Sequence, residues 1–126
     1  MNSDIKLIPL GDIRFGPSYF RLAISGREVA DSIFGEEYAV LDGGRFAAFE
    51  EWLTTDYTLG PITRVAIYDL VEGVKCHFET VEKGFVGDFE KLGDSFRYKK
   101  NYKGKKLIEE IEVDWKSISG WEAIHP

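Results

Sequence analysis

The sequence has little of the residues on which most small catalytic and metal centres depend. Its 126 residues include one cysteine, Cys76, and two histidines, His77 and His125. A single cysteine cannot form a disulfide within the chain, and the start Met-Asn-Ser-Asp lacks the basic and apolar regions of a secretory signal, so we expect a cytoplasmic protein. Neither a paired-cysteine pattern nor a calcium loop is present, and we therefore expect no metal and no cofactor.

Long apolar runs and an excess of basic residues are also missing. No window approaches the roughly 20 apolar residues of a membrane-spanning helix, so we expect no membrane insertion. The 16 Lys and Arg face 22 Asp and Glu, for a formal charge of -6 at pH 7. Such a field repels nucleic acids and attracts basic partners, although acidity is also a common way to stay soluble. What the chain does have is 44% hydrophobic residues, enough for one core in a single domain over residues 1–126.

Short alternating segments, separated by glycine and charged turns, predict a mostly β protein. Residues 19–24 alternate apolar and other side chains, as in a strand. Segments 62–70 and 74–79 form one expected hairpin, and segments 95–102 and 106–115 form another. The tail 119–124 should pack back on the sheet through its large side chains. We expect an antiparallel meander that forms a twisted sheet or a small two-sheet sandwich.

Two segments, 28–34 and 44–53, can be either helix or strand. In the second, Phe46, Phe49 and Leu53 fit a helical face, whereas the Asp-Gly turn that precedes it favours a hairpin. We favour strand, in a pattern similar to one propeller blade, although 126 residues are too few for a closed propeller. A helix in either segment would make the fold α+β.

Catalytic groups are not evident. His77 follows Cys76 directly, and neighbours on a strand point to opposite faces, so they form no local Cys-His pair. Carboxylates are plentiful, but on alternating strands they usually form the solvated face; they include Glu50, Glu51, Asp56, Asp69, Glu110, Glu112 and Asp114. We therefore predict a binding protein with no catalytic residues, not an enzyme.

One candidate contact surface is the acidic face of segment 106–115. Glu110, Glu112 and Asp114 share that face, and like charges in a row cost energy that a cationic partner would relieve. Alternatively, lysines on or near the neighbouring strand neutralise the stripe within the fold; these are Lys99, Lys100, Lys103, Lys105 and Lys106.

A second candidate surface is the loop 52–61. Trp52, Asp56 and Tyr57 combine aromatic and acidic groups, a mixture found at interface hot spots. The alternative is an ordinary connection whose aromatic side chains cap the core, with at least one of them buried.

Three stretches carry a resemblance to a known type of protein. Residues 15–22, 33–35 and 51–70 are similar to bacterial proteins associated with polymorphic toxin loci, and the chain resembles the immunity proteins of contact-dependent inhibition and related toxin systems. The resemblance implies a cognate toxin domain, often a basic nuclease, that is held inactive in the cytoplasm by occlusion of its active site. The expected contacts with it are Trp52, Asp56, Tyr57, Glu110, Glu112 and Asp114.

Two other functions remain open at this point. The first is a small-ligand binder or enzyme, in which a β cup encloses an aromatic pocket served by Tyr68, His77 and Glu79. The second is a structural subunit that self-associates through an exposed strand or aromatic patch.

Overall fold

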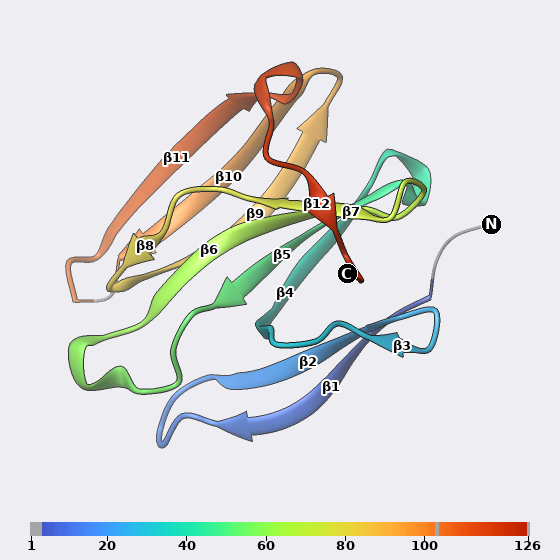
Figure 1. Ribbon diagram of the computed structural model, residues 1–126. Helices are drawn as coiled ribbons and strands as arrows, with labels where there is room; N and C mark the ends of the chain where they lie inside the picture. The colour runs from blue at the N-terminus through green and yellow to red at the C-terminus, as the bar shows by residue number, and fades with distance from the viewer. Residues whose placement is uncertain (1–3, 103, 126) are drawn as a thin grey trace.

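The computed structural model describes residues 4–102 and 104–125, and in them the protein is mostly antiparallel β (Figure 1). The strands are β1 (Ile5–Asp12), β2 (Ser18–Ile24), β3 (Arg27–Glu28), β4 (Ile33–Leu41), β5 (Phe46–Trp52), β6 (Ile62–Asp69), β7 (Val74–His77), β8 (Val81–Glu82), β9 (Gly84–Leu92), β10 (Ser95–Tyr102), β11 (Leu107–Asp114) and β12 (Glu122–Ala123). Short 3-10 turns are η1 (Asp42–Gly44), η2 (Tyr57–Leu59) and η3 (Trp115–Ser117). In the described ranges no helix could cross a membrane.

The strands form two sheets. The larger has the order β1-β2-β4-β5-β6-β7-β12, with β3 beside β2 and β8 beside β6, and the smaller has the order β11-β10-β9. Strands β4, β5 and β6 contact β9, and Figure 1 shows the β9–β11 sheet and the β1–β2 hairpin as two wings on either side of these central strands. The expected mostly β antiparallel fold is therefore confirmed.

The central strand β5 is buried along its whole length because each of its faces meets a core. Phe46 and Ala48 belong to a core with the β9–β11 sheet, whereas Ala47 and Phe49 belong to a core on the opposite face. A strand buried on both faces reads as a nearly continuous apolar run, which periodicity alone does not distinguish from a helix. Segment 44–53 is thus a strand, as favoured, and segment 28–34 contains no helix.

The expected hairpins and the expected return of the tail are confirmed. Strands β6 and β7 pair with Ile67 opposite Cys76, and β10 and β11 pair with Tyr98 opposite Ile111. The tail forms β12 beside β7. Ile124 is buried in the same core as Ala47 and Phe49.

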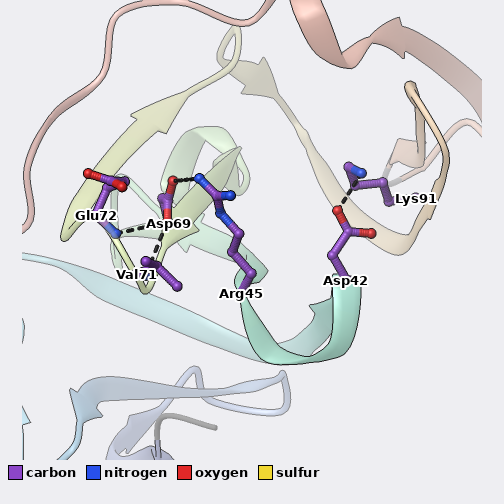
Figure 2. Close-up of polar contacts among 6 residues, drawn as sticks. All are labelled: Asp42, Arg45, Asp69, Val71, Glu72 and Lys91. Atoms are coloured by element: carbon purple, nitrogen blue, oxygen red, sulfur yellow. Dashed lines mark hydrogen bonds and ion pairs between the residues drawn. The ribbon is translucent and has the colours of Figure 1, made fainter. Parts of the chain in front are cut away.

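Polar contacts close one end of the central strands (Figure 2). The buried Asp69 carboxylate accepts hydrogen bonds from the backbone N–H groups of Val71 (3.1 Å) and Glu72 (3.0 Å), which fixes the β6–β7 turn. It also accepts one from Arg45 at 3.3 Å. Asp69 lies opposite Phe46 at the start of β5. The cleft described next lies at the other end of that strand, around Glu50 and Trp52.

Candidate functional site

A cleft of about 760 Å³ lies between the two wings, and most of the charged side chains that line it are acidic. Among the described residues that line it, one basic side chain, Lys99, faces four carboxylates. These are Glu36, Glu37, Glu50 and Asp88. The cleft is therefore a local concentration of negative charge on an already acidic protein.

Glu50 is the most unusual of these carboxylates because it is only 7% exposed. Its two oxygens accept hydrogen bonds from the Trp52 indole N–H (2.9 Å) and from the backbone N–H of Val86 (3.0 Å). Burial raises the pKa of Glu50 to about 7, and the charge of Glu37 adds to the rise, although the two hydrogen bonds oppose it. Glu50 can therefore lose its proton near neutral pH when a cation approaches.

Glycine at position 35 lets Glu50 reach the cleft. A Cβ atom there would lie 1.9 Å from Glu50 Oε1 and 2.8 Å from Trp52 Nε1, far inside contact distance. The β4–β5 register also shifts between Phe34 and Tyr38, and Glu36 and Glu37 lie within this irregular stretch. The bulge therefore supplies the carboxylates that line the cleft from β4.

Glu37 connects this bulge to the smaller sheet. Its Oε1 accepts a hydrogen bond from the backbone N–H of Asp88 at 2.6 Å. A Cβ on Gly87 would lie 2.4 Å from the Glu37 carboxylate, so glycine is required for this approach too. The carboxylate is thus held in place by β9, and is not a freely moving surface group.

Aromatic rings form one wall of the site. The Trp52 ring centroid lies 5.6 Å from that of Tyr19, 5.6 Å from that of Tyr57 and 6.5 Å from that of Phe85. Burial, followed by the charge of Glu50, raises the pKa of the Tyr57 hydroxyl, which keeps it neutral. Trp52 contacts the Glu50 carboxyl directly, and the other three rings pack against Trp52.

The expected contact residues of loop 52–61 are placed differently from one another. Trp52 is only 4% exposed, and its indole N–H donates to Glu50. It also lines the cleft, and its contact with a partner stays a prediction. Asp56 is exposed, and its carboxylate accepts from the backbone N–H of Thr58 (3.0 Å) and from its hydroxyl (2.6 Å), which lowers the Asp56 pKa. Tyr57 is half-buried against Trp52. The expected burial of at least one aromatic is confirmed.

Glu110, Glu112 and Asp114 are exposed on β11, as expected. Ile108 lies on the same face of this strand and lines the cleft. The acidic stripe, defined here as Glu110, Glu112 and Asp114, therefore continues the acidic surface of the cleft.

Neutralisation of the acidic stripe from within the fold is only partial. Arg97 lies 3.6 Å from Glu112, and the Ser95 hydroxyl donates to the same carboxylate. Lys99 pairs in register with Glu110, but its Nζ lies 3.4 Å from Asp88. In residues 4–102 and 104–125 no ion pair involves Glu110; Lys103, one of the expected neutralising lysines, lies outside the described residues. Within the part of the chain that the structure describes, Arg97 forms the ion pair with the acidic stripe, and none of Lys99, Lys100, Lys105 and Lys106 does.

The alternative pocket of Tyr68, His77 and Glu79 does not form as a unit. Tyr68 and His77 lie on the face of β6 that points away from the β9–β11 sheet, near Arg64 and Glu51. Glu79 instead pairs with Lys100 of the smaller sheet. That three-residue grouping is therefore wrong, although two of its members stay close.

Comparisons with protein-family models, curated proteins and solved structures found no match to this chain. The function of the site is therefore inferred from its geometry and charges. No cluster of three or more metal-binding side chains occurs in the described part of the chain.

The residues that sequence reasoning missed are Glu50 and Glu37, which it did not separate from the other carboxylates. A usable signal was present for Glu50. The run Phe-Ala-Ala-Phe before it is apolar at successive positions, which is typical of a strand covered on both faces. Carboxylates that continue such a strand are candidates for burial, and a buried carboxylate is a candidate functional group.

Proposed function

We propose that this protein binds a basic toxin domain and neutralises it, as the immunity proteins that it resembles would do. The observation that supports this function best is the continuous acidic surface formed by the cleft and the acidic stripe. A surface of one sign accelerates association with a partner of opposite sign and selects against other partners.

The cleft is suited to a lysine or arginine side chain of the partner. Glu50 and Glu37 are held in position by hydrogen bonds to β9, so little ordering entropy is lost when a cation arrives. Phe85 lines the same cleft and offers a ring face to a cation. The bound partner would be held against the cleft and the acidic stripe, and its own active site would be covered.

The test begins with the tagged protein as bait in a native bacterial lysate, followed by expression of any captured basic domain in cells with and without this protein. We expect the captured domain to be toxic when it is expressed alone and harmless when it is expressed with this protein.

The variant Glu36→Lys/Glu110→Lys should weaken binding at least tenfold and abolish protection. The control Glu72→Lys/Glu82→Lys has the same change of charge at exposed positions outside the cleft and should retain both.

Two outcomes would reject this function or the contact surface assigned to it. One is a captured domain that is equally toxic with and without the protein. The other is equal loss of binding in the cleft variant and the control, which would mean that net charge alone matters.

A second candidate function is the binding of a small organic cation. It is favoured by the buried Glu50 carboxylate, because a cleft of about 760 Å³ is of the size that holds small molecules. Putrescine at constant ionic strength is a suitable probe. A saturable rise in melting temperature that Glu50→Gln removes would favour this function, and no rise beyond that caused by sodium chloride would count against it.

A further inference from the structure

In residues 4–102 and 104–125 the strand orders of the two sheets end at four edge strands: β1 and β12 in the larger sheet, β9 and β11 in the smaller. β12 is only two residues long. β1 contains Pro9, which has no N–H to donate, and its pairing with β2 shifts register between Pro9 and Gly11. Short strands, prolines and bulges are the usual protection of a sheet edge against pairing with another chain. Both edges of the larger sheet are therefore closed to a further strand.

The β9 edge of the smaller sheet is closed by side chains of the larger sheet. The backbone N–H of Val86 donates to the Glu50 carboxyl at 3.0 Å, and that of Asp88 donates to the Glu37 carboxylate at 2.6 Å. A strand added beside β9 would need these same N–H groups for its own hydrogen bonds. They are already bonded, so this edge is closed as well.

Among the described edge strands, β11 lacks this kind of protection. It is eight residues long, contains no proline or glycine, and pairs with β10 in one unbroken register. No described strand pairs with its other side, and Figure 1 shows it at the outer margin of the smaller sheet. The β11 edge is therefore open to a further strand along its length.

The pairing with β10 shows which backbone groups of β11 face the open side. The N–H of Trp115, directly after the strand, donates to the carbonyl of Asp94 in the β9–β10 turn at 2.6 Å. Along an antiparallel pair, residues whose N–H and C=O point to the partner strand alternate with residues whose groups point away. Counted back from Trp115, the residues of β11 that present N–H and C=O to the open side are Ile108, Glu110 and Glu112.

The side chains of β11 determine which strand fits beside it. The acidic stripe is exposed on one face, whereas Ile111 and Val113 are half-buried on the other face, against the core. Two copies of β11 placed side by side would bring their acidic stripes together, and like charges on adjacent strands are unfavourable. A fitting strand therefore carries basic residues on the face of the acidic stripe and apolar residues on the other face.

We propose that β11 pairs with an extended segment of the partner in which lysine or arginine alternates with apolar residues. The basic side chains lie beside the acidic stripe, and the apolar side chains extend the core beyond Ile111 and Val113. Backbone hydrogen bonds supply affinity in this mode of recognition, and the alternating side chains supply selectivity. This inference rests on the proposed function, because the segment belongs to the neutralised domain, but the experiment below needs no toxin.

The probe is a disulfide-closed β-hairpin peptide whose outer strand reads Lys-Val-Lys-Val-Lys-Val-Lys, built so that the backbone N–H groups of the lysines point outward. NMR follows amide hydrogen exchange in the intact chain as the peptide is added at constant ionic strength. We expect saturable binding that slows exchange of the Glu110 and Glu112 amides about tenfold or more, because these amides become hydrogen-bonded. The Ile111 amide, which points to β10, is the internal control.

Two matched comparisons separate strand pairing from charge attraction. The same peptide with methyl groups on the backbone nitrogens of its lysines keeps every charge but cannot donate to β11, and it should bind about tenfold or more weakly. In the protein, Glu110→Pro and Glu110→Gln remove the same charge, but only proline also removes the outward N–H, a change that edge strands tolerate. Glu110→Pro should bind the peptide about tenfold more weakly than Glu110→Gln. Should Glu110→Pro fail to fold, the comparison of the two peptides still decides.

Three results would overturn strand pairing at β11. Equal affinity for the two peptides, or of the two variants, would show attraction by charge alone. Unchanged exchange at Glu110 and Glu112 would mean that the acidic side chains only guard the edge against pairing. A captured toxic domain that Glu110→Pro and Glu110→Gln neutralise equally well would reject strand pairing and leave the proposed function standing.

Discussion

Glu50 and Glu51 are neighbours on β5, yet they line two different clefts on opposite faces of the strand. Both are buried, at 7% and 3% exposure. Glu50 meets two neutral N–H donors and no cation, and burial raises its pKa to about 7. Glu51 meets the guanidinium of Arg64 from the adjacent strand. Glu50 and Glu51 have nearly the same neighbours in the chain. The strand that faces each carboxylate therefore decides whether it is paired with a cation.

The largest expected effect is on the Glu51 side. Arg64→Met leaves a buried carboxylate without its cation and should lower the free energy of unfolding by about 3 kcal/mol. Urea denaturation at pH 7 measures it. Arg64→Met/Glu51→Leu should recover most of the loss, because it removes the uncompensated charge as well. A loss no larger than that of the exposed-site variant Lys116→Met would mean that the pair does not stabilise the fold.

The second prediction concerns pH and the Glu50 side. The folded-state pKa of Glu50, about 7, lies above the ordinary 4.5, so the folded protein binds this proton more tightly than the unfolded chain. The stability that the folded protein gains from this tightly bound proton is fully present below pH 4.5. It is lost as the pH rises through 7. Between pH 5 and pH 8 the loss should be about 2 to 3 kcal/mol.

Urea denaturation across this pH range, in the unaltered chain and in Glu50→Gln, isolates the contribution of Glu50. The difference between the two curves should show the expected slope. Parallel curves would contradict it. His77 acts in an overlapping range with the opposite sign, because its lowered pKa removes stability as the pH falls below its ordinary value of 6.5. Both chains contain His77, so its contribution cancels in the difference between the curves.

The third prediction tests the close approach at Gly35. Gly35→Ala forces a methyl group against the Glu50 carboxyl and should cost about 2 kcal/mol by overpacking. Gly35→Ala/Glu50→Ala should be more stable than the single variant, since it removes the closest clash, although the contact with Trp52 Nε1 remains. Gly73→Ala is the control, because that position has open space and a positive φ of 70°. Because the φ of Gly35 is not positive, the cost of Gly35→Ala measures steric overlap, and a negligible cost would contradict it.

The smallest expected effect on stability is on β11. Glu110→Lys should leave the midpoint of urea unfolding unchanged, because Glu110 is exposed and has no ion pair in the described residues. The same change should weaken binding of a basic partner. A clear shift of the midpoint would mean that the acidic stripe is part of the fold and not a contact surface.

Much of the fold could be predicted from the sequence. Alternation located β6 with β7 and β10 with β11, and the turn at Asp42 made a strand the better choice for the segment at Phe46. The acidic face of β11 was also correctly placed on the surface. The near-complete burial of Trp52 could not be predicted, because a pattern of aromatic residues does not indicate which ring the neighbouring strands will cover.

The sequence by itself determined the alternation, the hairpins and the net charge, because these depend on neighbours within a few residues. Only the tertiary structure decided that Glu50 is buried against β9 while Glu51 pairs with Arg64 of β6. It also decided that β11 lies at an edge of its sheet while the β9 edge is closed by Glu37 and Glu50. The physical reason is that strand register and the packing of two sheets bring together residues far apart in the chain, and local patterns carry no record of that pairing.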